Sequence, residues 1–578
     1  MKSQKSVSLL HEVLMEGLYH NAVLRVKEVE FKTHTIILRR CSPYFRALFK
    51  YQSTADNMVF DISDLSPNSM QLILEFAYTG SVNVRKDNVE ELIIAADMLN
   101  VMAVVQACAD FISEQLCPEN CIGIWRLTNV VNCDLQQKAH RYITCHFEQV
   151  YLCEEFLQLS VQELVGILDR DELNVKMEFI VFKAVSHWIS HRPEEREKHI
   201  ALLLSKVRLA LTSMRCIYVD VMSNELVMNN TACQKMASDA IKTIQYKIRQ
   251  KPSVFGFRNV FARPRLPNAI LLAIGGWRGS SPVSDIEAFD VCAGRWFKVV
   301  HNLDRPRAYH GTAFLDGYLY CIGGIDQMER FNTVCRMHLR TQTWQEVSSM
   351  YYGRCYVCTT VLNGCIYALG GFDGYFRLHS AECYAPKTNQ WKCIAEMHFS
   401  RSDASCTTLH NKIYVCGGYD GHGSLETAEC YNSETNQWTM IAPMNSKRTG
   451  LGVIAHADLV YAIGGCQSSI RHSSAEAYNP QTNTWNVMSS MSTPRSSFGL
   501  GVINEQIYVV GGFTGPRVSN KVECYDKDLD RWSLACGIKR FRTALSCCVV
   551  YGIPNIADFI VPRDSLPLIH LDDRAVVS

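Results

Sequence analysis

The stretch KIYVCGGYDGHGSLETAECYNSETNQW, residues 412–438, decides the fold of the C-terminal half of the chain. It begins with a short run of apolar and β-branched residues, reaches a glycine pair at 417 and 418, and ends on Trp438. Short apolar runs separated by turn residues such as Asn436 are typical of β-strands. The glycine pair fits a strand end where a side chain would block the close approach of another backbone.

The same pattern occurs six times. Glycine pairs stand at 275/276, 323/324, 370/371, 417/418, 464/465 and 511/512, and a tryptophan follows each at constant distance: Trp296, Trp344, Trp391, Trp438, Trp485 and Trp532. An arginine recurs in step at Arg307, Arg354, Arg401, Arg448, Arg495 and Arg542. Seven residues before each tryptophan stands Phe289, Met337, Tyr384, Tyr431, Tyr478 or Tyr525. The sequence therefore holds six copies of one unit.

Each unit is long enough for four short strands, and such a sheet cannot bury both faces alone. We therefore predict six sheets that stack around an axis, with Trp and Tyr filling the space between them. The first unit begins at Ala269 without an arginine-led strand, whereas the segment from Arg542 to Val550 is one strand too many. We expect this last segment to pair with the strand Ile270 to Ile274 and close the ring, which leaves no long open edge.

These repeats resemble kelch repeats, whose period is near 50 residues, more than the shorter WD40 repeats. The resemblance covers residues 269–550 and implies an all-β, six-bladed kelch β-propeller. A linker, residues 251–268, contains three prolines and is expected to be stiff, and residues 551–578 form a C-terminal tail.

The front of the chain is predicted to be mixed α/β and then all-helical. A helical face at Leu10, Val13 and Leu14 is followed by a hairpin pattern, Leu24 and Val26 and then Val29 and Phe31. Ser42 before Pro43, and Ser66 before Pro67, are helix-start signals, and Gly80 is a stop signal. Further on, Ser160 and Glu163 form a capping box before an apolar run.

Two more family resemblances follow from these residues. The run from His34 through Cys41 to Phe49, with Phe76, Ala77 and Tyr78, resembles a BTB domain, and we assign residues 8–116 to it. The phrases Asp171 to Val175, His187 to Ile189 and Lys206 to Arg208 resemble a BACK domain of kelch-like proteins, assigned to residues 119–250. The chain is thus predicted to be multidomain: an α/β BTB domain, an all-α BACK domain and a kelch propeller.

The resemblance to kelch-like proteins implies a function. Such proteins commonly act as substrate adaptors, in which BTB and BACK hold a cullin-3 ubiquitin ligase while the propeller face holds a protein substrate. It implies a homodimer through the BTB domain, with Leu10, Val13 and Leu14 on the dimer helix. The alternative is a cytoskeletal or scaffold protein that uses paired propellers and avidity without ubiquitin transfer.

One departure from the family keeps that alternative open. Many cullin-binding members carry a hydrophobic residue and then Glu, four and six places after the phenylalanine that corresponds to Phe49. Here these places hold Ser53 and Ala55. The resemblance thus implies a cullin-contact region at Phe49, Ser53 and Ala55 that lacks an apolar side chain and a carboxylate.

Substrate is expected on the face where the loops after Gly-Gly meet the loops before the arginine-led strands. The residues just after each glycine pair, with three that lie two places after an arginine, form the predicted substrate face: Trp277, Tyr309, Ile325, Tyr356, Phe372, Asp403, Tyr419, Cys466 and Phe513. Aromatic side chains there would make a rigid hot-spot surface. The six arginines either clamp an acidic substrate or tie neighbouring blades through backbone carbonyls, and we favour the second role.

Several other chemistries are disfavoured. Cys355 and Cys358 have a metal-ligand gap but lie on opposite faces if extended, and His34 has no legible nucleophile or acid beside it. No phosphate-binding loop, metalloprotease motif or serine elbow is present. We predict no catalytic residues, no metal and no cofactor. Cys466 as a redox sensor is a third, weaker hypothesis.

Bulk composition agrees with this assignment. Basic and acidic residues number 58 and 57, so no global field attracts nucleic acid or an anionic membrane. The 25 cysteines are scattered, the N-terminus lacks the apolar core of a signal peptide, and no apolar run reaches membrane-spanning length. We expect a soluble, cytoplasmic protein.

Overall fold

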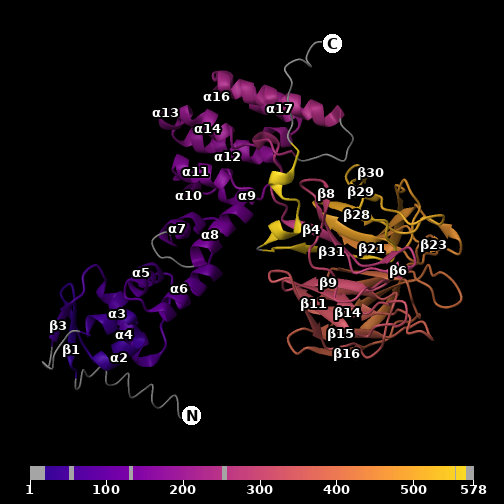
Figure 1. Cartoon of the computed structure of the whole chain (residues 1–578), viewed down its shortest axis with the longest axis horizontal. Helices are drawn as coiled ribbons and strands as arrows, with labels where there is room; N and C mark the ends of the chain where they lie inside the picture. Colours follow the sequence, from indigo (N-terminus) through magenta and orange to yellow (C-terminus); the bar gives the residue numbers. More distant parts are fainter. Residues whose placement is uncertain (1–19, 51–57, 129–133, 250–256, 554, 568–578) are drawn as a thin grey trace. The chain divides into compact units, whose positions relative to one another are not determined.

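The computed structural model describes residues 20–50, 58–128, 134–249, 257–553 and 555–567. The chain divides into two compact units, one of residues 1–176 with 180–203 and the other of residues 177–179 with 204–578. Each unit is described by itself below, and Figure 1 labels the elements of both. In the described part of the chain, no helix combines the length and apolar character needed to cross a lipid bilayer.

The first unit starts with a three-stranded sheet covered by helices. Strands β1 (Ala22–Val26) and β2 (Val29–Thr33) form the predicted hairpin, and β3 (Met58–Asp61) pairs in parallel with β1. Leu24, Leu38, Phe45 and Ile73 lie in one buried core. The helices of this part are α2 (Thr35–Cys41), α3 (Pro43–Leu48), α4 (Pro67–Thr79), α5 (Val89–Met98) and α6 (Met102–Glu114).

The helix ends follow the sequence signals. The Ser42 hydroxyl accepts a hydrogen bond from the Tyr44 N–H at 3.0 Å, and Ser66 accepts one from the Ser69 N–H at 3.2 Å. Gly80 ends α4 with φ of 74°, in the left-handed region that suits glycine. The predicted caps and stop are therefore confirmed.

All described elements between residues 119 and 249 are helical, as predicted. The Ser160 and Glu163 capping box is present at the start of α11. The helices are α7 (Cys121–Thr128), α8 (Asp134–Cys145), α9 (Phe147–Val150), α10 (Glu154–Leu157), α11 (Val161–Leu168), α12 (Glu178–His191), α13 (Pro193–Arg196), α14 (Ile200–Leu204), α15 (Met214–Cys216), α16 (Glu225–Met228) and α17 (Thr231–Arg249).

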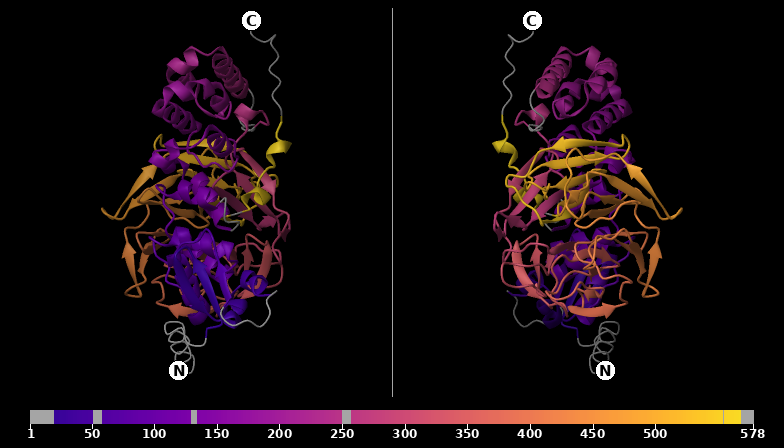
Figure 2. Two further views of the ribbon diagram at one scale, coloured as in Figure 1. Left: turned by 90° about the vertical axis from the view of Figure 1, so that its left-hand side faces the viewer. Right: turned by 90° about the vertical axis from the view of Figure 1, so that its right-hand side faces the viewer.

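The second unit contains six four-stranded antiparallel sheets, which we number as blades. Blade 1 consists of β31 (Ser546–Tyr551), β4 (Ala269–Ile274), β7 (Ile286–Asp290) and β8 (Arg295–Lys298), and blade 2 of β9 (Gly311–Leu315), β10 (Tyr318–Ile322), β11 (Val334–His338) and β12 (Thr343–Val347). Blade 3 consists of β13 (Cys358–Leu362), β14 (Cys365–Leu369), β15 (Ala381–Ala385) and β16 (Gln390–Ile394), and blade 4 of β17 (Ser405–Leu409), β18 (Lys412–Cys416), β19 (Ala428–Asn432) and β20 (Gln437–Ile441). Blade 5 consists of β21 (Gly452–His456), β22 (Leu459–Ile463), β25 (Ala475–Asn479) and β26 (Thr484–Met488), and blade 6 of β27 (Gly499–Ile503), β28 (Gln506–Val510), β29 (Val522–Asp526) and β30 (Arg531–Ala535). Figure 2 shows these sheets from two opposite sides, with colours that run from magenta through orange to yellow.

The ring closes as predicted. Strand β31 pairs antiparallel with β4, with Val550 opposite Ile270 and Ser546 opposite Ile274, and Figure 1 shows the yellow strand beside the magenta one. The first and last parts of the propeller sequence therefore share one sheet, and the closing strand comes from the C-terminal end.

The repeated tryptophans join neighbouring blades. Each indole N–H donates to a backbone carbonyl at the end of the preceding blade at 2.7–2.8 Å; the acceptors are Cys536, Asn302, Ser348, Ala395, Ala442 and Ser489 for Trp296, Trp344, Trp391, Trp438, Trp485 and Trp532. A buried indole N–H needs such an acceptor, so one side chain supplies both apolar area and an inter-blade hydrogen bond.

The linker and the tail hold each other against blade 1. The Arg563 guanidinium donates to the carbonyls of Pro264 and Arg265 at 2.9 and 2.7 Å and pairs with the buried carboxylate of Asp290. Arg265 in turn pairs with buried Glu178 at 2.5 Å. The described part of the linker, residues 257–268, is thus held by a buried polar network, in line with the expected stiffness.

Candidate functional site

Six residues form the innermost feature of the propeller, and we call them the mouth ring: Tyr309, Tyr356, Asp403, Gly450, Ser497 and Ala544. Each lies two places after one of the repeated arginines. All six have φ between 51° and 61°, in the left-handed region. That conformation is strained for residues other than glycine, so the surrounding structure must hold it in place.

A closed circle of backbone hydrogen bonds supplies that constraint. Each ring residue donates its N–H to the carbonyl of the ring residue before it, at 2.8–3.1 Å, and Tyr309 donates to Ala544 at 3.0 Å across the closing blade. Because every member is bonded on both sides, the ring presents its side chains in a preorganised arrangement.

A central cavity of about 270 Å³ opens at this ring and is lined by the first strands of the blades. The Tyr309 and Tyr356 rings lie with their centroids 4.0 Å apart. Burial raises the pKa of the Asp403 carboxyl to about 6, although the Arg377 charge opposes the shift. The ring therefore combines two phenols with a carboxylate that titrates near neutral pH, all on one side of the mouth.

The structure places the other predicted face residues next to this ring. Each residue after a glycine pair forms a β-bridge with the residue that follows an arginine: Trp277 with Thr543, Ile325 with Ala308, Phe372 with Cys355, Tyr419 with Ser402, Cys466 with Thr449 and Phe513 with Ser496. All six are half-buried. The nine predicted substrate-face residues are thus brought together around the mouth.

Arginines cover several of these aromatic side chains. The Arg377 guanidinium lies 3.8 Å from the centroid of the Phe372 ring and 5.5 Å from that of Tyr419, and Arg471 lies 4.9 Å from that of Phe513. Such cation–π stacking holds both partners rigid. Sequence reasoning missed these arginines because they belong to the connections after the glycine pairs and do not recur in all six repeats.

Loop tips beyond the ring carry exposed apolar side chains that the sequence analysis also missed. Tyr375 and Phe376 are 87% and 72% exposed. Their loop is ordered by the Asp373 carboxylate, which accepts from both backbone N–H groups at 2.7 Å. Asp373 therefore acts as a turn residue that orders this loop.

The six repeated arginines are buried, and five of them pair with a glutamate. Arg354 is representative: it donates to the carbonyls of Gly370 and Ser380 at 2.8 and 2.9 Å and to Glu382 at 2.8 Å. The equivalent pairs are Arg401 with Glu429, Arg448 with Glu476, Arg495 with Glu523 and Arg542 with Glu287. Backbone carbonyls are thus among the acceptors, as the favoured structural role predicts, and all these partners lie in the blade that the arginine leads.

The backbone of these arginines, in contrast, does link the blades. The carbonyl of Arg354 accepts from the Gly324 N–H of blade 2 at 2.7 Å, and Arg401 accepts from Gly371 of blade 3 at 2.7 Å. The arginine side chains have an exposure at or near zero, so they do not reach a substrate on the face. Their arrangement fits a structural role and not the clamping of an acidic substrate.

Blade 2 departs from this pattern. Cys335 stands where the other blades have a glutamate, and Arg307 pairs only with the half-exposed Asp304 at 3.6 Å. The Cys335 thiol donates to Asp304 at 3.3 Å. Burial raises the pKa of this thiol, so it remains protonated.

The remaining candidates have ordinary surroundings. Burial raises the pKa of the Cys466 thiol, which argues against a reactive thiolate. Cys355 and Cys358 donate to the carbonyls of Phe372 and Leu369, and the His34 ring contacts the Tyr78 hydroxyl at 2.7 Å. Within the described ranges, no three His, Cys, Asp or Glu side chains converge as metal ligands would.

Only part of the predicted cullin and dimer regions can be placed. Phe49 is buried and packs edge-on against Phe60, with ring centroids 5.0 Å apart. Ser53 and Ala55, together with Leu10, Val13 and Leu14, lie outside the described residues.

Three family models match the chain. The BTB/POZ domain matches residues 10–116, the "BTB And C-terminal Kelch" (BACK) model matches 121–221, and the Kelch motif matches 270–300, 306–351, 353–398, 400–445, 447–492 and 494–535. The six kelch matches end before the closing strand β31, which the repeat phase predicted and the structure assigns to the propeller.

Curated relatives agree with these matches. Kelch-like protein 3 of Mus musculus is 34% identical over 327 residues, which cover 56% of this chain and 55% of the relative. Kelch-like protein 28 of Homo sapiens is 34% identical over 362 residues, or 59% of this chain and 63% of the relative. The aligned part thus spans between about half and two thirds of the length of these relatives.

Proposed function

Since the chain belongs to the Kelch-like family of BTB, BACK and kelch proteins, we propose that it is a substrate-recognition adaptor of a cullin-3 RING ubiquitin ligase. In this role the BTB and BACK domains dimerise and bind cullin-3, and the propeller recruits an as yet unknown protein substrate. Family members are typically adaptors, and we infer a non-catalytic subunit here too.

The mouth ring is the observation that supports recognition by the propeller. A circle of side chains fixed by its own backbone hydrogen bonds, with half-buried aromatic residues around it, loses little conformational entropy when a partner binds. We propose the predicted substrate face, Tyr309, Tyr356 and Asp403 included, as the recruiting surface.

The binding of the full-length chain to the N-terminal domain of cullin-3 tests the adaptor role. We expect micromolar or tighter affinity by calorimetry. Replacing Asp403 by Ala on the propeller face is the matched control and should leave cullin affinity unchanged.

Ser53 and Ala55, where the sequence departs from many cullin-binding relatives, allow a sharper version of this binding test. A double variant, Ser53→Leu with Ala55→Glu, restores the residue types that many cullin-binding relatives carry, and we expect it to tighten cullin binding about tenfold, or 1.4 kcal/mol. If neither the native chain nor this variant binds cullin-3, the adaptor proposal fails and the scaffold alternative takes its place.

We propose a cytoplasmic homodimer without nucleic-acid or membrane partners. The BACK phrases that begin at Asp171 also resemble those of kelch-like protein ten, and we propose a role in spermatogenesis on that resemblance alone.

A further inference from the structure

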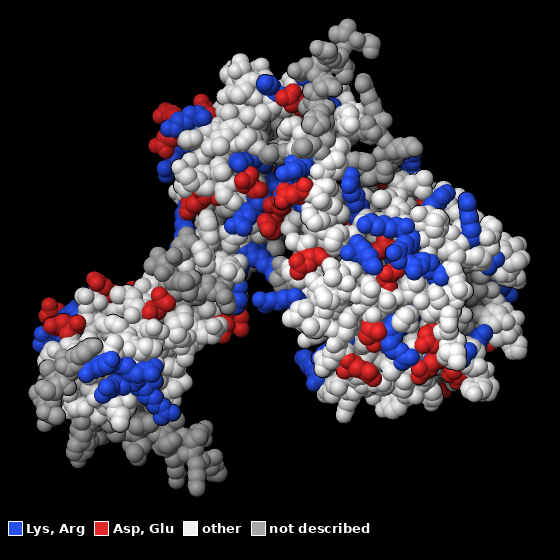
Figure 3. Space-filling view, viewed as in Figure 1, with Lys and Arg blue, Asp and Glu red and all other residues white. Residues whose placement is uncertain are grey.

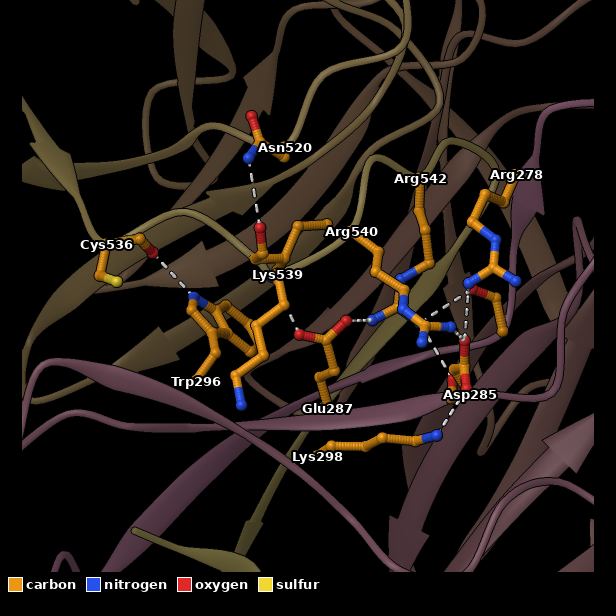
Figure 4. A network of polar contacts seen from close by, with 12 residues as sticks. Arg278, Asp285, Glu287, Trp296, Lys298, Asn520, Cys536, Lys539, Arg540 and Arg542 are labelled. Atoms are coloured by element: carbon orange, nitrogen blue, oxygen red, sulfur yellow. Dashed lines mark hydrogen bonds and ion pairs between the residues drawn. The ribbon is translucent and has the colours of Figure 1, made fainter. Parts of the chain in front are cut away.

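A dense group of charged side chains lies beside the closing strand. Asp285, between the glycine pair and β7 of blade 1, accepts from three cations: Arg540 at 3.0 Å, Arg278 at 3.2 Å and Lys298 at 3.4 Å. Figure 4 shows the three side chains converging on this one carboxylate. We call Arg278, Lys298 and Arg540 the seam cations.

The seam cations face solvent, whereas their carboxylate does not. Their side chains are 43%, 49% and 48% exposed, against 12% for Asp285. Each uses only part of its hydrogen-bonding capacity on Asp285, and a guanidinium has five N–H donors. Donors therefore remain free on the outer side of the cluster.

The cluster carries an excess of positive charge. Arg278, Lys298 and Arg540 pair with Asp285 and Arg542 pairs with Glu287, so that four cations share these two carboxylates (Figure 4). Glu287 is occupied, since it accepts from the buried Arg542 side chain and from the Lys539 N–H. Burial alone would raise the pKa of Asp285, but Lys298, Arg540 and Arg542 outweigh it and lower that pKa, so the carboxylate stays ionised.

The other five repeats show that this cluster is peculiar to blade 1. The residues equivalent to Arg278 are Asp326, Asp373, Asp420, Gln467 and Thr514, and those equivalent to Lys298 are Glu346, Cys393, Met440, Val487 and Leu534. Blade 2 has a cation equivalent to Arg540, namely Arg305, but Asp326 and Glu329 both pair with it at 3.3 Å. The excess charge is thus not a requirement of the repeat.

The space-filling view agrees with this account. Lys and Arg side chains gather around a few acidic ones on the propeller surface, near the labels β8 and β28 of Figure 1 (Figure 3). Arg278 also follows directly after Trp277, a predicted substrate-face residue. The cluster therefore borders the surface proposed to recruit substrate.

We propose that the seam cations bind a phosphate group on a phosphorylated side chain of the recruited protein. A phosphomonoester carries close to two negative charges and three acceptor oxygens, which match two guanidinium groups and one ammonium. A single carboxylate would compensate only half of the excess charge that the seam cations have over Asp285. This inference rests on the proposed function, because it assumes that the propeller face receives a protein.

A phosphoprotein fits better than a lipid surface. Polybasic membrane sites typically present about four to eight lysines and arginines in one run or on one helix face. Here three seam cations surround a carboxylate on a folded surface, and the whole chain has a net charge of only +1. The arrangement favours one compact dianion.

The test uses the full-length chain and fluorescent degenerate peptide pools with a fixed central phosphoserine, serine or glutamate, at constant ionic strength. We expect the phosphoserine pool to bind at least tenfold more tightly than the other two. The double variant Arg278→Gln with Lys298→Gln should reduce binding of the phosphoserine pool to the level of the serine pool. Arg305→Gln, a matched arginine whose charge is already compensated, should leave it unchanged.

The single variant Lys298→Gln is expected to fold normally, because three other blades have Met, Val or Leu at the equivalent place. It should weaken phosphoserine binding about threefold or more. Equal binding of all three pools would overturn the proposal. So would a loss of phosphoserine binding in the Arg305→Gln chain as large as that in the double variant. Binding of phosphatidylserine vesicles that depends on the seam cations, without phosphoserine preference, would assign the site to lipid and also overturn it.

The same variants are measured for cullin-3 binding. A chain that binds cullin-3 but shows no phosphoserine preference refutes only this inference. A chain that prefers phosphoserine but does not bind cullin-3 refutes only the adaptor role.

Discussion

Asp403 is held in a place that disfavours its charge. Burial raises its pKa to about 6, above the ordinary value of about 3.9 for Asp. Between these two values the folded chain keeps a proton that the unfolded chain has lost, so stability falls as the pH rises through this window and stays lower above it. A functional role at the mouth would account for the retention of a carboxylate at such a position.

Replacing Asp403 by Asn should therefore stabilise the propeller at pH 8 by about 2 kcal/mol, a figure reduced for the solvent that reaches the half-buried side chain. The gain should shrink towards zero below about pH 4, where Asp403 is protonated in both states. Thermal unfolding followed at pH 4, 6 and 8 measures this. An equal difference at all three values would show that the ring does not shift the pKa of Asp403.

Glu382 and Cys335 occupy equivalent places in neighbouring blades. We expect Glu382→Gln to destabilise the propeller by about 3 kcal/mol, because buried Arg354 would lose its counter-charge. Cys335→Ala should cost only about 1 kcal/mol, because it removes one small buried side chain and leaves the Arg307 pair with Asp304 in place. Denaturant unfolding followed by tryptophan fluorescence compares the two, and similar losses would contradict the role assigned to the glutamates.

At the level of elements, the first strands of the blades approach one another closely around the axis. A Cβ atom on Gly499 of β27 would lie 2.1 Å from the Cys547 sulfur of β31, and one on Gly501 would lie 2.4 Å from a Leu271 methyl group. Glycine at these places allows the last blade to pack against the closing strand.

We therefore expect Gly499→Ala to lower the stability of the propeller by about 2 kcal/mol through overpacking. Gly423→Ala is the matched control, since nothing lies within 4 Å of a Cβ there and its φ is not positive, and it should be close to neutral. Differential scanning calorimetry compares the thermal stability of the two variants. If Gly499→Ala left the stability unchanged, the first strands would be less tightly packed than described.

The repeated residues allowed the blades, the closure by residues 546–551 and the helix caps to be predicted, because spacing alone determines which residues meet. The mouth ring was predicted only in part. Tyr309, Tyr356 and Asp403 are recognisable as binding residues, whereas Gly450, Ser497 and Ala544 share only a backbone conformation that no common side chain reveals. The buried glutamates had a signal that was overlooked, since they recur at one place in five of the six repeats.

The cluster around Asp285 could not be predicted from the sequence for a different reason. Its members come from the two ends of the propeller sequence and meet only because the ring closes, so no local pattern shows them together. The same closure brings Arg563 of the tail against Asp290 and the linker.

For the whole molecule, the account depends on the C-terminal strand as the piece that completes blade 1. Without the strand and the segment from Lys539 that leads into it, β4 would lose one of its two partners, the mouth ring would lose Ala544, and Asp285 would lose Arg540. Both proposed recognition surfaces therefore depend on the same closure.

Two shortened chains test this most directly, one ending after Ile538 and one after Tyr551, with hydrogen exchange measured at the amides of β4. The longer chain keeps the closing strand and loses only the tail, so we predict protection in β4 close to that of the full chain. The shorter chain should lose this protection and unfold at a lower temperature. Equal protection of β4 in both chains would contradict a ring closed by the C-terminal strand.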